Sequence, residues 1–141
     1  MQDCIFCKII KGEIPSSKVY EDNMTFAFLD LKPVNLGHIL VVPKEHSANI
    51  YETPDAHLEA MIKTAKKVSI AVKKSTNADG VNLAMNNNHA AGQVIFHSHF
   101  HIIPRYHNDG FELWHGKREY KNEEEMKELA EKIQKEINPR L

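Results

Sequence analysis

The sequence predicts an α+β fold, in which an antiparallel sheet of about five strands packs with two helices. Five short apolar runs, rich in β-branched and aromatic residues, are separated by turn signals, and each is long enough for one strand. Two longer stretches repeat apolar residues every three or four positions, which is the helical period. Runs of strands with one central and one terminal helix are typical of α+β proteins with antiparallel sheets.

The first three strands are expected in the first third of the chain. Residues 18–20 and 24–29 flank the turn signal EDN and predict a hairpin. The run HILVVP at 38–43 is apolar and β-branched, is entered through Gly37, and ends at Pro43. Such a run is typical of a buried strand.

A helix is expected from Pro54 to about Thr76, because the apolar period changes there from two to between three and four. Its apolar positions are Leu58, Met61, Ile62, Ala65, Val68 and Val72. Two further strands are predicted at 81–86 and 94–104. A second helix is predicted over 126–137, behind the acidic start NEEE, which favours a helix N-terminus.

Length and charge narrow the class of protein. The 141 residues fit one domain, with 42% hydrophobic residues for a single core. A net charge of -1 argues against a broad nucleic-acid-binding surface. No apolar run approaches the roughly 18 residues that a membrane span needs, and the N-terminus lacks a signal-peptide pattern. We therefore expect a cytoplasmic protein without membrane or nucleic-acid partners, whose two cysteines are thiols or metal ligands.

Three of the nine histidines, His97, His99 and His101, alternate along the last predicted strand and would share one of its faces. Chance on an exposed strand is one interpretation, but the flanking apolar residues indicate burial, and buried imidazoles need partners. A second interpretation is a single metal ion held by all three histidines. The outer two would lie roughly 13 Å apart along the strand, which is too far for ligands of one ion. The third interpretation, which we favour, is catalysis by the middle imidazole, with its neighbours holding its tautomer.

The motif HSHFHII resembles the His-x-His-x-His signature of the histidine-triad (HIT) family of nucleotide hydrolases and transferases. Four more blocks are similar to bacterial members: CIFCKIIKGEIPSSKVYED, AFLDLKPVNLGHILVVPKEH, NNNHAAGQ and HIIPR. The resemblance covers most of residues 4–106 and is weaker over the C-terminal loop and helix, 107–141. It implies one HIT domain over 1–141, with a HIT-like fold and a homodimer whose sheets join.

The resemblance also implies a mechanism. His99 would attack the α-phosphate of a nucleotide and form a nucleotidyl-histidine intermediate, which water then releases as a nucleoside monophosphate. His101 and His38 would surround the phosphate as orienting and hydrogen-bonding partners. Neutral imidazole, the nucleophilic form, is available near pH 7. A strand-opening histidine without a catalytic role is the alternative for His38.

Further residues match the nucleotide contacts of the family. Asp30 matches the acid that holds the ribose hydroxyls, and a carboxylate accepts two such hydrogen bonds well. Asn86 and Gln93 match amides that contact the phosphate, and Gly92 would let the backbone approach closely, although a plain turn is equally consistent with it. Val94 departs from the pattern, because several members have a serine there whose hydroxyl contacts the phosphate. This protein lacks that contact, so the resemblance does not define which leaving group it prefers.

Cys4 and Cys7 form a C-x-x-C pair, which is half of a zinc site. His46 and His97 are candidates to complete it, and a Cys2His2 arrangement is seen in zinc-containing members of the family. Such a closed site leaves no position for substrate, so the zinc would be structural. A redox pair and two unrelated thiols are the alternatives, but the βαβ context of a thioredoxin-like pair is missing.

These residues lead to one favoured function and two alternatives. The favoured one is a hydrolase of nucleoside phosphoramidates or other adenylylated compounds, with a purine nucleotide as substrate and a covalent His99 intermediate. A dinucleoside polyphosphate hydrolase would use every motif named above. A zinc-stabilised nucleotide-binding or interaction module, in which turnover is incidental, is the third. A binder would keep its affinity without His99, whereas an enzyme would lose turnover.

Overall fold

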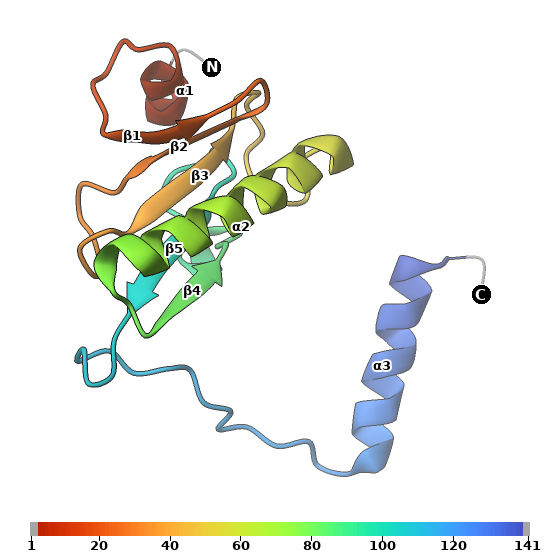
Figure 1. Ribbon diagram of the computed structural model, residues 1–141. Coiled ribbons are helices and arrows are strands. Elements are labelled where there is room, and N and C mark those ends of the chain that lie inside the picture. The colour runs from red at the N-terminus through yellow and green to blue at the C-terminus, as the bar shows by residue number, and fades with distance from the viewer. Residues whose placement is uncertain (1–2, 140–141) are drawn as a thin grey trace. The chain divides into compact units, whose positions relative to one another are not determined.

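The computed structural model describes residues 3–139 (Figure 1). Its contacts divide the chain into two compact units, Met1–Asp109 and Gly110–Leu141. The first unit holds the sheet and every candidate site residue. The expectation that all 141 residues form one domain stays a prediction.

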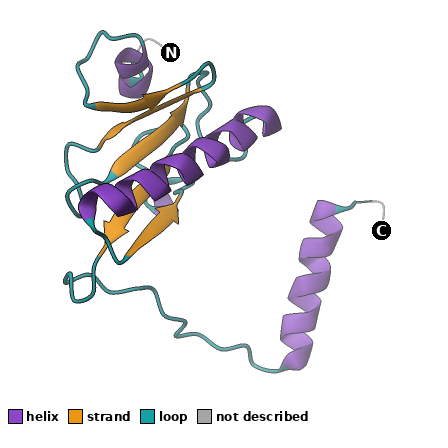
Figure 2. Cartoon of the chain, viewed as in Figure 1, coloured by secondary structure: helices purple, strands orange, loops and turns teal. Residues whose placement is uncertain are grey.

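The first unit is built on a five-stranded sheet, as the sequence predicts (Figure 2). The strands are β1 (Lys18–Glu21), β2 (Thr25–Leu29), β3 (Ile39–Pro43), β4 (Gly80–Ala84) and β5 (Phe100–Arg105). Their order across the sheet is β1-β2-β3-β5-β4, and every neighbouring pair is antiparallel. The α+β class and the antiparallel sheet are confirmed.

One face of the sheet packs against α2 (Asp55–Thr76), which lies across the strands in Figure 1. The apolar stripe of α2 supplies Ala65, Val68 and Val72 to a core that includes Val41 of β3 and Ile102 of β5. All five are at least 96% buried, so burial of this stripe drives the helix onto the sheet.

The other face of the sheet is covered by α1 (Ile5–Ile10), a short helix that the sequence analysis did not anticipate. Phe6 of α1 packs with Phe26, Phe28, Leu40 and Val42 in a second core. Leu40 and Val42 alternate with Val41 along β3, so the strand contributes to both cores and is apolar throughout.

The last strand is shorter than predicted, which corrects the expectation for 94–104. β5 begins at Phe100, and residues 94–99 form no strand. The Ser98 N–H donates to the Ser47 carbonyl at 2.7 Å, outside the ladder that pairs β3 with β5. Only His101 of the three histidines therefore lies on the sheet, and the assumption that all three share one strand face was wrong.

The second unit contains α3 (Glu123–Ile137), which the sequence predicted. Asn122 caps it by accepting a hydrogen bond from the Glu125 N–H at 2.8 Å, and three acidic residues occupy its first turn. No helix in the described part of the chain is both long enough and apolar enough to cross a membrane.

Candidate active site and metal group

The imidazole of His99 is held in one tautomer by the backbone. Its Nδ1 lies 2.6 Å from the carbonyl oxygen of His97, and a carbonyl only accepts, so Nδ1 carries the hydrogen. Nε2 is then left with a lone pair. The side chain is buried, and burial lowers its pKa, although the carbonyl contact and the Asp30 carboxylate oppose this effect. His99 is therefore a neutral imidazole with a lone pair on Nε2 at pH 7.

His38 and His101 form a hydrogen-bonded pair whose tautomers are also fixed. The Val34 N–H donates to Nδ1 of His38 at 3.1 Å, so the His38 hydrogen is on Nε2. That N–H faces Nδ1 of His101 at 3.0 Å, which leaves the hydrogen of neutral His101 on its Nε2. The His99 and His101 ring centroids lie 4.9 Å apart. The His99 ring, whose Nε2 has a free lone pair, therefore lies beside the His101 ring, whose Nε2–H can donate a hydrogen bond.

Burial keeps both imidazoles of this pair neutral. It lowers the pKa of His101 to about 4, with smaller contributions from His99 and His38. It also lowers the pKa of His38, against the attraction of the Asp30 carboxylate. Two protonated rings whose facing nitrogens are 3.0 Å apart would repel each other, so the pair donates and accepts hydrogen bonds as neutral groups at physiological pH.

We expect this pair to make the protein sensitive to acid. The folded pKa of His101, about 4, lies below the usual value of 6.5. Its contribution to stability is therefore complete above pH 6.5 and is lost as the pH falls from 6.5 towards 4. Glutamine does not titrate in this range. In His101→Gln, the decrease in unfolding free energy between pH 6.5 and pH 4 should therefore be smaller than in the wild type, by on the order of 2 kcal/mol. Urea unfolding at several pH values measures this, and equal slopes for both proteins would contradict it.

Asp30 follows β2 and lies next to the histidine pair. Its Oδ1 accepts from the Lys32 N–H at 2.9 Å, and its Oδ2 lies 3.7 Å from Nε2 of His38. The Asp30 N–H also donates to the His38 carbonyl at 2.9 Å. Within the described residues, Oδ2 of Asp30 therefore accepts no hydrogen bond, and the Asp30 side chain is 23% exposed.

The loop before the histidine motif is held by Gln93. The Gln93 amide, 2% exposed, donates to the Ala48 and Ile95 carbonyls at 2.6 and 3.1 Å and accepts from the Asn88 N–H at 2.8 Å. These contacts occupy the Gln93 side chain within the protein, and its predicted contact with phosphate stays a prediction. Gly92 has a φ of 91° and lies beside Asn86, whose amide is 3.5 Å from the Gly92 carbonyl.

Cys4, Cys7, His46 and His97 come together from three segments that are far apart in the sequence. Their ligand atoms all lie within 4.8 Å of one another. Nδ1 of His97 is 3.3 Å from Sγ of Cys4, 3.5 Å from Sγ of Cys7 and 3.2 Å from Nδ1 of His46. We call these four residues the metal group.

The donor set of the metal group fits a tetrahedral zinc ion. Zinc–nitrogen distances of about 2.0–2.1 Å and zinc–sulfur distances of about 2.3 Å require ligand atoms about 3.3–3.8 Å apart. Four of the six pairs of ligand atoms lie 3.2–3.5 Å apart, and all six lie within 4.8 Å. His97 is prepared to ligate, because its Nε2–H donates to the Pro43 carbonyl at 2.8 Å and leaves the Nδ1 lone pair facing the group. Burial lowers the pKa of His97 to about 4, so this nitrogen stays unprotonated.

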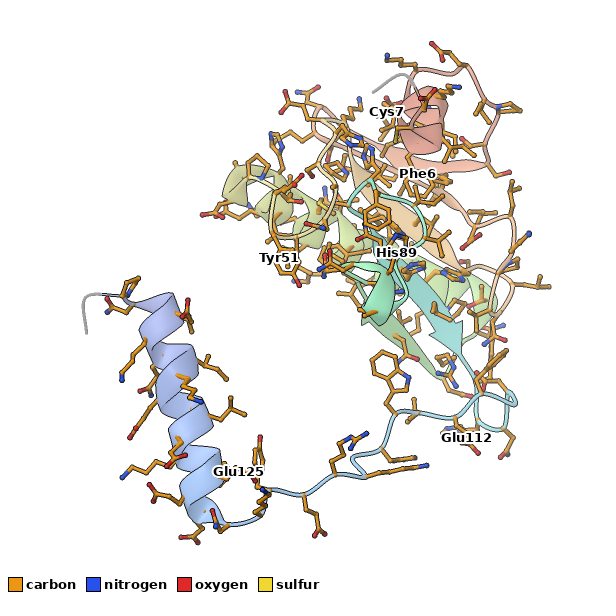
Figure 3. The ribbon with its side chains drawn as sticks, turned by 180° about the vertical axis from the view of Figure 1, so that it is seen from behind. Phe6, Cys7, Tyr51, His89, Glu112 and Glu125 are labelled. Atoms are coloured by element: carbon orange, nitrogen blue, oxygen red, sulfur yellow. The ribbon has the colours of Figure 1, made fainter. Side chains whose placement is uncertain are left out.

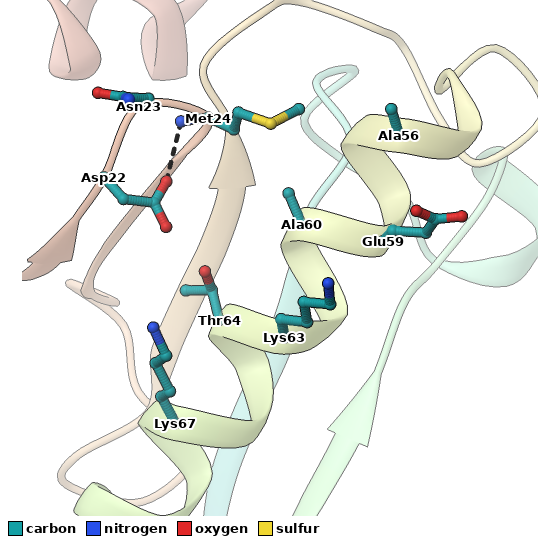
Figure 4. Close-up of a pocket in the computed structure, with 9 residues that line it drawn as sticks. All are labelled: Asp22, Asn23, Met24, Ala56, Glu59, Ala60, Lys63, Thr64 and Lys67. Atoms are coloured by element: carbon teal, nitrogen blue, oxygen red, sulfur yellow. Dashed lines mark hydrogen bonds between the residues drawn. The ribbon is translucent and has the colours of Figure 1, made fainter.

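Two hollows of the first unit lie at different distances from the metal group. One, of about 500 Å³, lies between the β1–β2 turn and α2 (Figure 4). Its carboxylate from Asp22 is already occupied by the backbone N–H groups of Met24 and Thr25, and no histidine or cysteine lines it. Another, of about 440 Å³, borders the metal group and is lined by Asp3, Cys4, Ile5, His46, Val94, Ile95 and Phe96.

Some partners of these residues were not anticipated. The backbone groups of Val34, Pro43 and His97 fix the histidine tautomers, and a backbone group has no signature in the sequence. Phe6 of α1 also lies close to two of these histidines. The centroid of its ring lies 5.1 Å from that of His99 and 5.9 Å from that of His97, with an edge-to-face arrangement in both pairs. Figure 3 labels Phe6 and Cys7, which are neighbours on α1.

His38, His99 and His101 gather at one place beside an antiparallel five-stranded sheet, and His97 precedes them in the alternating motif. This arrangement is typical of the class of histidine-triad proteins. A comparison with models of protein families identifies the particular family. The HIT domain model matches residues 11–108, and the chain belongs to this family.

Relatives and solved structures agree with this assignment. An uncharacterized HIT-like protein of Borreliella burgdorferi is 46% identical over 94% of this chain and 97% of its own length. Adenosine 5'-monophosphoramidase hnt1 of Schizosaccharomyces pombe is 41% identical over 95% of this chain and 98% of its own. Adenylylsulfatase HINT3 of Arabidopsis thaliana is 50% identical over 76% of this chain, which spans 54% of that protein.

Two crystal structures bear on the fold and on the metal group. A Streptococcus mutans protein superposes with a TM-score of 0.93 at 44% identity, covering 98% of this chain and 87% of that one. A Zn-bound histidine triad family protein from Mycobacterium smegmatis has a TM-score of 0.75 at 31% identity, with 98% and 97% covered.

Proposed function

We propose that the protein is a hydrolase of nucleoside phosphoramidates or related adenylylated compounds, which it cleaves at the α-phosphate through a nucleotidyl-His99 intermediate. The observation that carries this proposal is the 2.6 Å hydrogen bond from Nδ1 of His99 to the His97 carbonyl. It leaves Nε2 as the unprotonated nitrogen in a buried, neutral ring, which is the form of histidine that attacks phosphorus. The relatives named adenylylsulfatase and adenosine 5'-monophosphoramidase support the same chemistry.

The reaction has two steps. In the first, Nε2 of His99 forms a bond to the α-phosphorus, the bond from phosphorus to the leaving group breaks, and the leaving group takes a proton from water. The imidazole is then positively charged, and the His97 carbonyl stabilises it by accepting the Nδ1–H hydrogen bond. In the second, water attacks phosphorus, and the Nε2–phosphorus bond breaks with its electron pair returning to Nε2. The proton that the attacking water loses neutralises the hydroxide left by the first step. A nucleoside monophosphate is released, and neutral His99 is regenerated.

His101 and His38 serve the phosphate without giving up a proton. The Nε2–H of His101 would donate a hydrogen bond to a phosphate oxygen and stabilise its negative charge in each transition state. His38 keeps His101 in this donor tautomer through the 3.0 Å contact between their rings. Asn86, Gln93 and Gly92 are proposed to line the phosphate from the neighbouring loop.

Turnover of two substrates tests the proposal. The protein should release AMP from an adenosine phosphoramidate faster than from a diadenosine polyphosphate. Faster cleavage of the polyphosphate would instead assign the dinucleoside polyphosphate hydrolase. Release of AMP from neither compound, with AMP still bound, would contradict an enzyme and indicate the nucleotide-binding module.

Asp30 is proposed to hold the ribose hydroxyls through Oδ2, the carboxylate oxygen that does not accept from the Lys32 N–H. Asp30→Ala should weaken AMP binding by about 1–3 kcal/mol, because a charged hydrogen-bond acceptor for the two hydroxyls is lost. Isothermal titration calorimetry measures the affinity. Asp55→Ala, which removes an exposed carboxylate at the start of α2, is the matched control and should bind AMP as the wild type does. Unchanged affinity in Asp30→Ala would remove this residue from the nucleotide site.

The metal group is proposed to hold a structural zinc ion. Four protein ligands fill a tetrahedral shell, so zinc there would have no open position for substrate. Its contribution would be to tie α1, the segment after β3 and the segment before β5 together. The Zn-bound relative supports this assignment.

A homodimer remains the proposed assembly. β1 and β4 are the edge strands of the sheet, and each edge presents backbone groups that a second copy could pair. Joining of two sheets, as the family resemblance implies, would use one of these edges. Sedimentation of the full chain measures the mass of the assembly, and a monomer at micromolar concentration would contradict this proposal.

A further inference from the structure

The proposed nucleophile lies outside the regular ladder of the sheet. β5 begins at Phe100, so the hydrogen bonds that pair it with β3 and β4 start after His99. Residues 97–99 are tied instead by the Ser98 N–H bond to the Ser47 carbonyl. Ser47 directly follows His46, a member of the metal group. The position of His99 therefore depends on contacts with the segments that the metal group joins.

His97 connects the metal group to His99 through one residue. Its Nδ1 faces Cys4, Cys7 and His46, while its Nε2–H is bonded to the Pro43 carbonyl. Its side chain is completely buried. Its own carbonyl accepts the Nδ1–H of His99 at 2.6 Å. One residue therefore carries both a ligand atom of the metal group and the carbonyl that fixes the His99 tautomer.

α1 provides a second connection between the same two sites. Phe6 lies between Cys4 and Cys7 in the sequence and is 6% exposed. The centroids of the Phe6 and His99 rings lie 5.1 Å apart, and the rings meet edge to face at an interplanar angle of 89°. A helix of six residues has little stability by itself. Ligation of Cys4 and Cys7 would hold α1, and with it Phe6, in place.

We propose that the metal group positions the nucleophile: its metal fixes the His97 carbonyl and the Phe6 ring, and these hold His99 with Nδ1 protonated and Nε2 free. This inference rests on the proposed function, in which His99 attacks phosphorus. His97 and Phe6 are positioning residues, because neither needs to touch the substrate. Loss of the metal lets the His97 carbonyl turn away, so that His99 populates both tautomers and only a fraction of molecules is ready to attack.

Two substitutions at one position separate metal ligation from the rest of the His97 side chain. His97→Ala removes a ligand, and His97→Cys replaces it with a thiolate that zinc also accepts. Both keep the carbonyl. Relative to wild type, His97→Ala should lower kcat for the phosphoramidate by about 10–100-fold, in the range known for residues that orient a site from outside it, and leave the Kd for AMP within about twofold. His97→Cys should recover zinc and most of kcat. Val72→Ala, a core truncation on α2, controls for lost stability and should retain kcat.

The second readout is the His99 ring itself, measured by 15N–1H NMR without any substrate. The zinc-loaded wild type and His97→Cys should show a protonated Nδ1 and an unprotonated Nε2, and His97→Ala should show a mixture of tautomers. If His97→Ala does not fold, the zinc- and cadmium-loaded wild-type proteins take its place. Cadmium forms longer bonds and should shift the His99 Nδ1 resonance if the two sites are coupled.

Opposite outcomes overturn the inference. A His99 tautomer and kcat that survive the loss of metal in His97→Ala would show that the two sites are independent, as would identical His99 resonances in the zinc and cadmium forms. The protein could instead turn over neither test substrate while its His99 tautomer still changes with the metal. That result would support the coupling and contradict the proposed function. The two proposals thus fail separately.

Discussion

The His99→Ala variant is expected to lose the ability to release AMP, by about 1,000-fold or more in kcat, while it still binds AMP. Alanine removes the Nε2 lone pair that attacks phosphorus, and water alone is a poor substitute in a site arranged for covalent transfer. The nucleotide contacts proposed for Asp30, Asn86 and His101 remain. Binding and turnover should therefore separate, and steady-state rates together with calorimetric affinities for AMP measure both.

A second histidine provides the control for this substitution. His107→Ala removes an exposed imidazole that follows β5 by two residues and should leave kcat unchanged. If His99→Ala kept kcat within tenfold of wild type, His99 would not be the nucleophile. If it lost AMP binding as completely as turnover, the residue would belong to a binding site, as the nucleotide-binding module requires.

The largest expected effect on stability follows from Cys7→Ala. Cys7 is buried, and burial, followed by the neighbouring Cys4, raises the pKa of its thiol, so without a cation the group stays protonated. A zinc ion would deprotonate both thiols and convert its binding energy into folding energy. Cys7→Ala should lose the metal and about 4 kcal/mol or more of unfolding free energy. Metal analysis and urea unfolding measure the two quantities.

Chelation distinguishes loss of metal from loss of packing. A strong chelator should lower the melting temperature of the wild-type protein and of Val72→Ala, which retains the metal group. The same chelator should leave Cys7→Ala unchanged, since this variant has no metal to lose. A wild-type protein that is purified without metal and is equally stable with and without chelator would exclude the structural zinc.

The strands and the central helix could be predicted because their patterns are local. HILVVP and the stripe of Val68 and Val72 reflect burial on a strand and on a helix, and the structure confirms both. α1 was missed because its six residues, IFCKII, are too few to show a helical period. The alternation of VIFHSHFHII favours a strand from residue 94, but the contact of Ser98 with Ser47 is tertiary and ends the ladder at Phe100.

The residue types of the site could be predicted from the sequence, but the position of the hydrogen on each imidazole could not. The HSHFHII motif and the C-x-x-C pair identify side chains that can attack phosphorus or bind a metal. Which nitrogen of each imidazole carries hydrogen depends on the backbone groups of Val34, Pro43 and His97. The sequence does not locate these groups, because any residue type supplies the same N–H and carbonyl.

Intact-protein mass spectrometry of a rapidly quenched reaction tests the covalent mechanism most directly. After mixing with an adenosine phosphoramidate, the wild-type protein should gain the mass of one adenylyl group, and fragmentation should place that group on His99. The group should disappear as AMP accumulates, and His99→Ala should never acquire it. Turnover by the wild type without any adenylylated protein at the shortest times, or with the group on another residue, would contradict catalysis through nucleotidyl-His99.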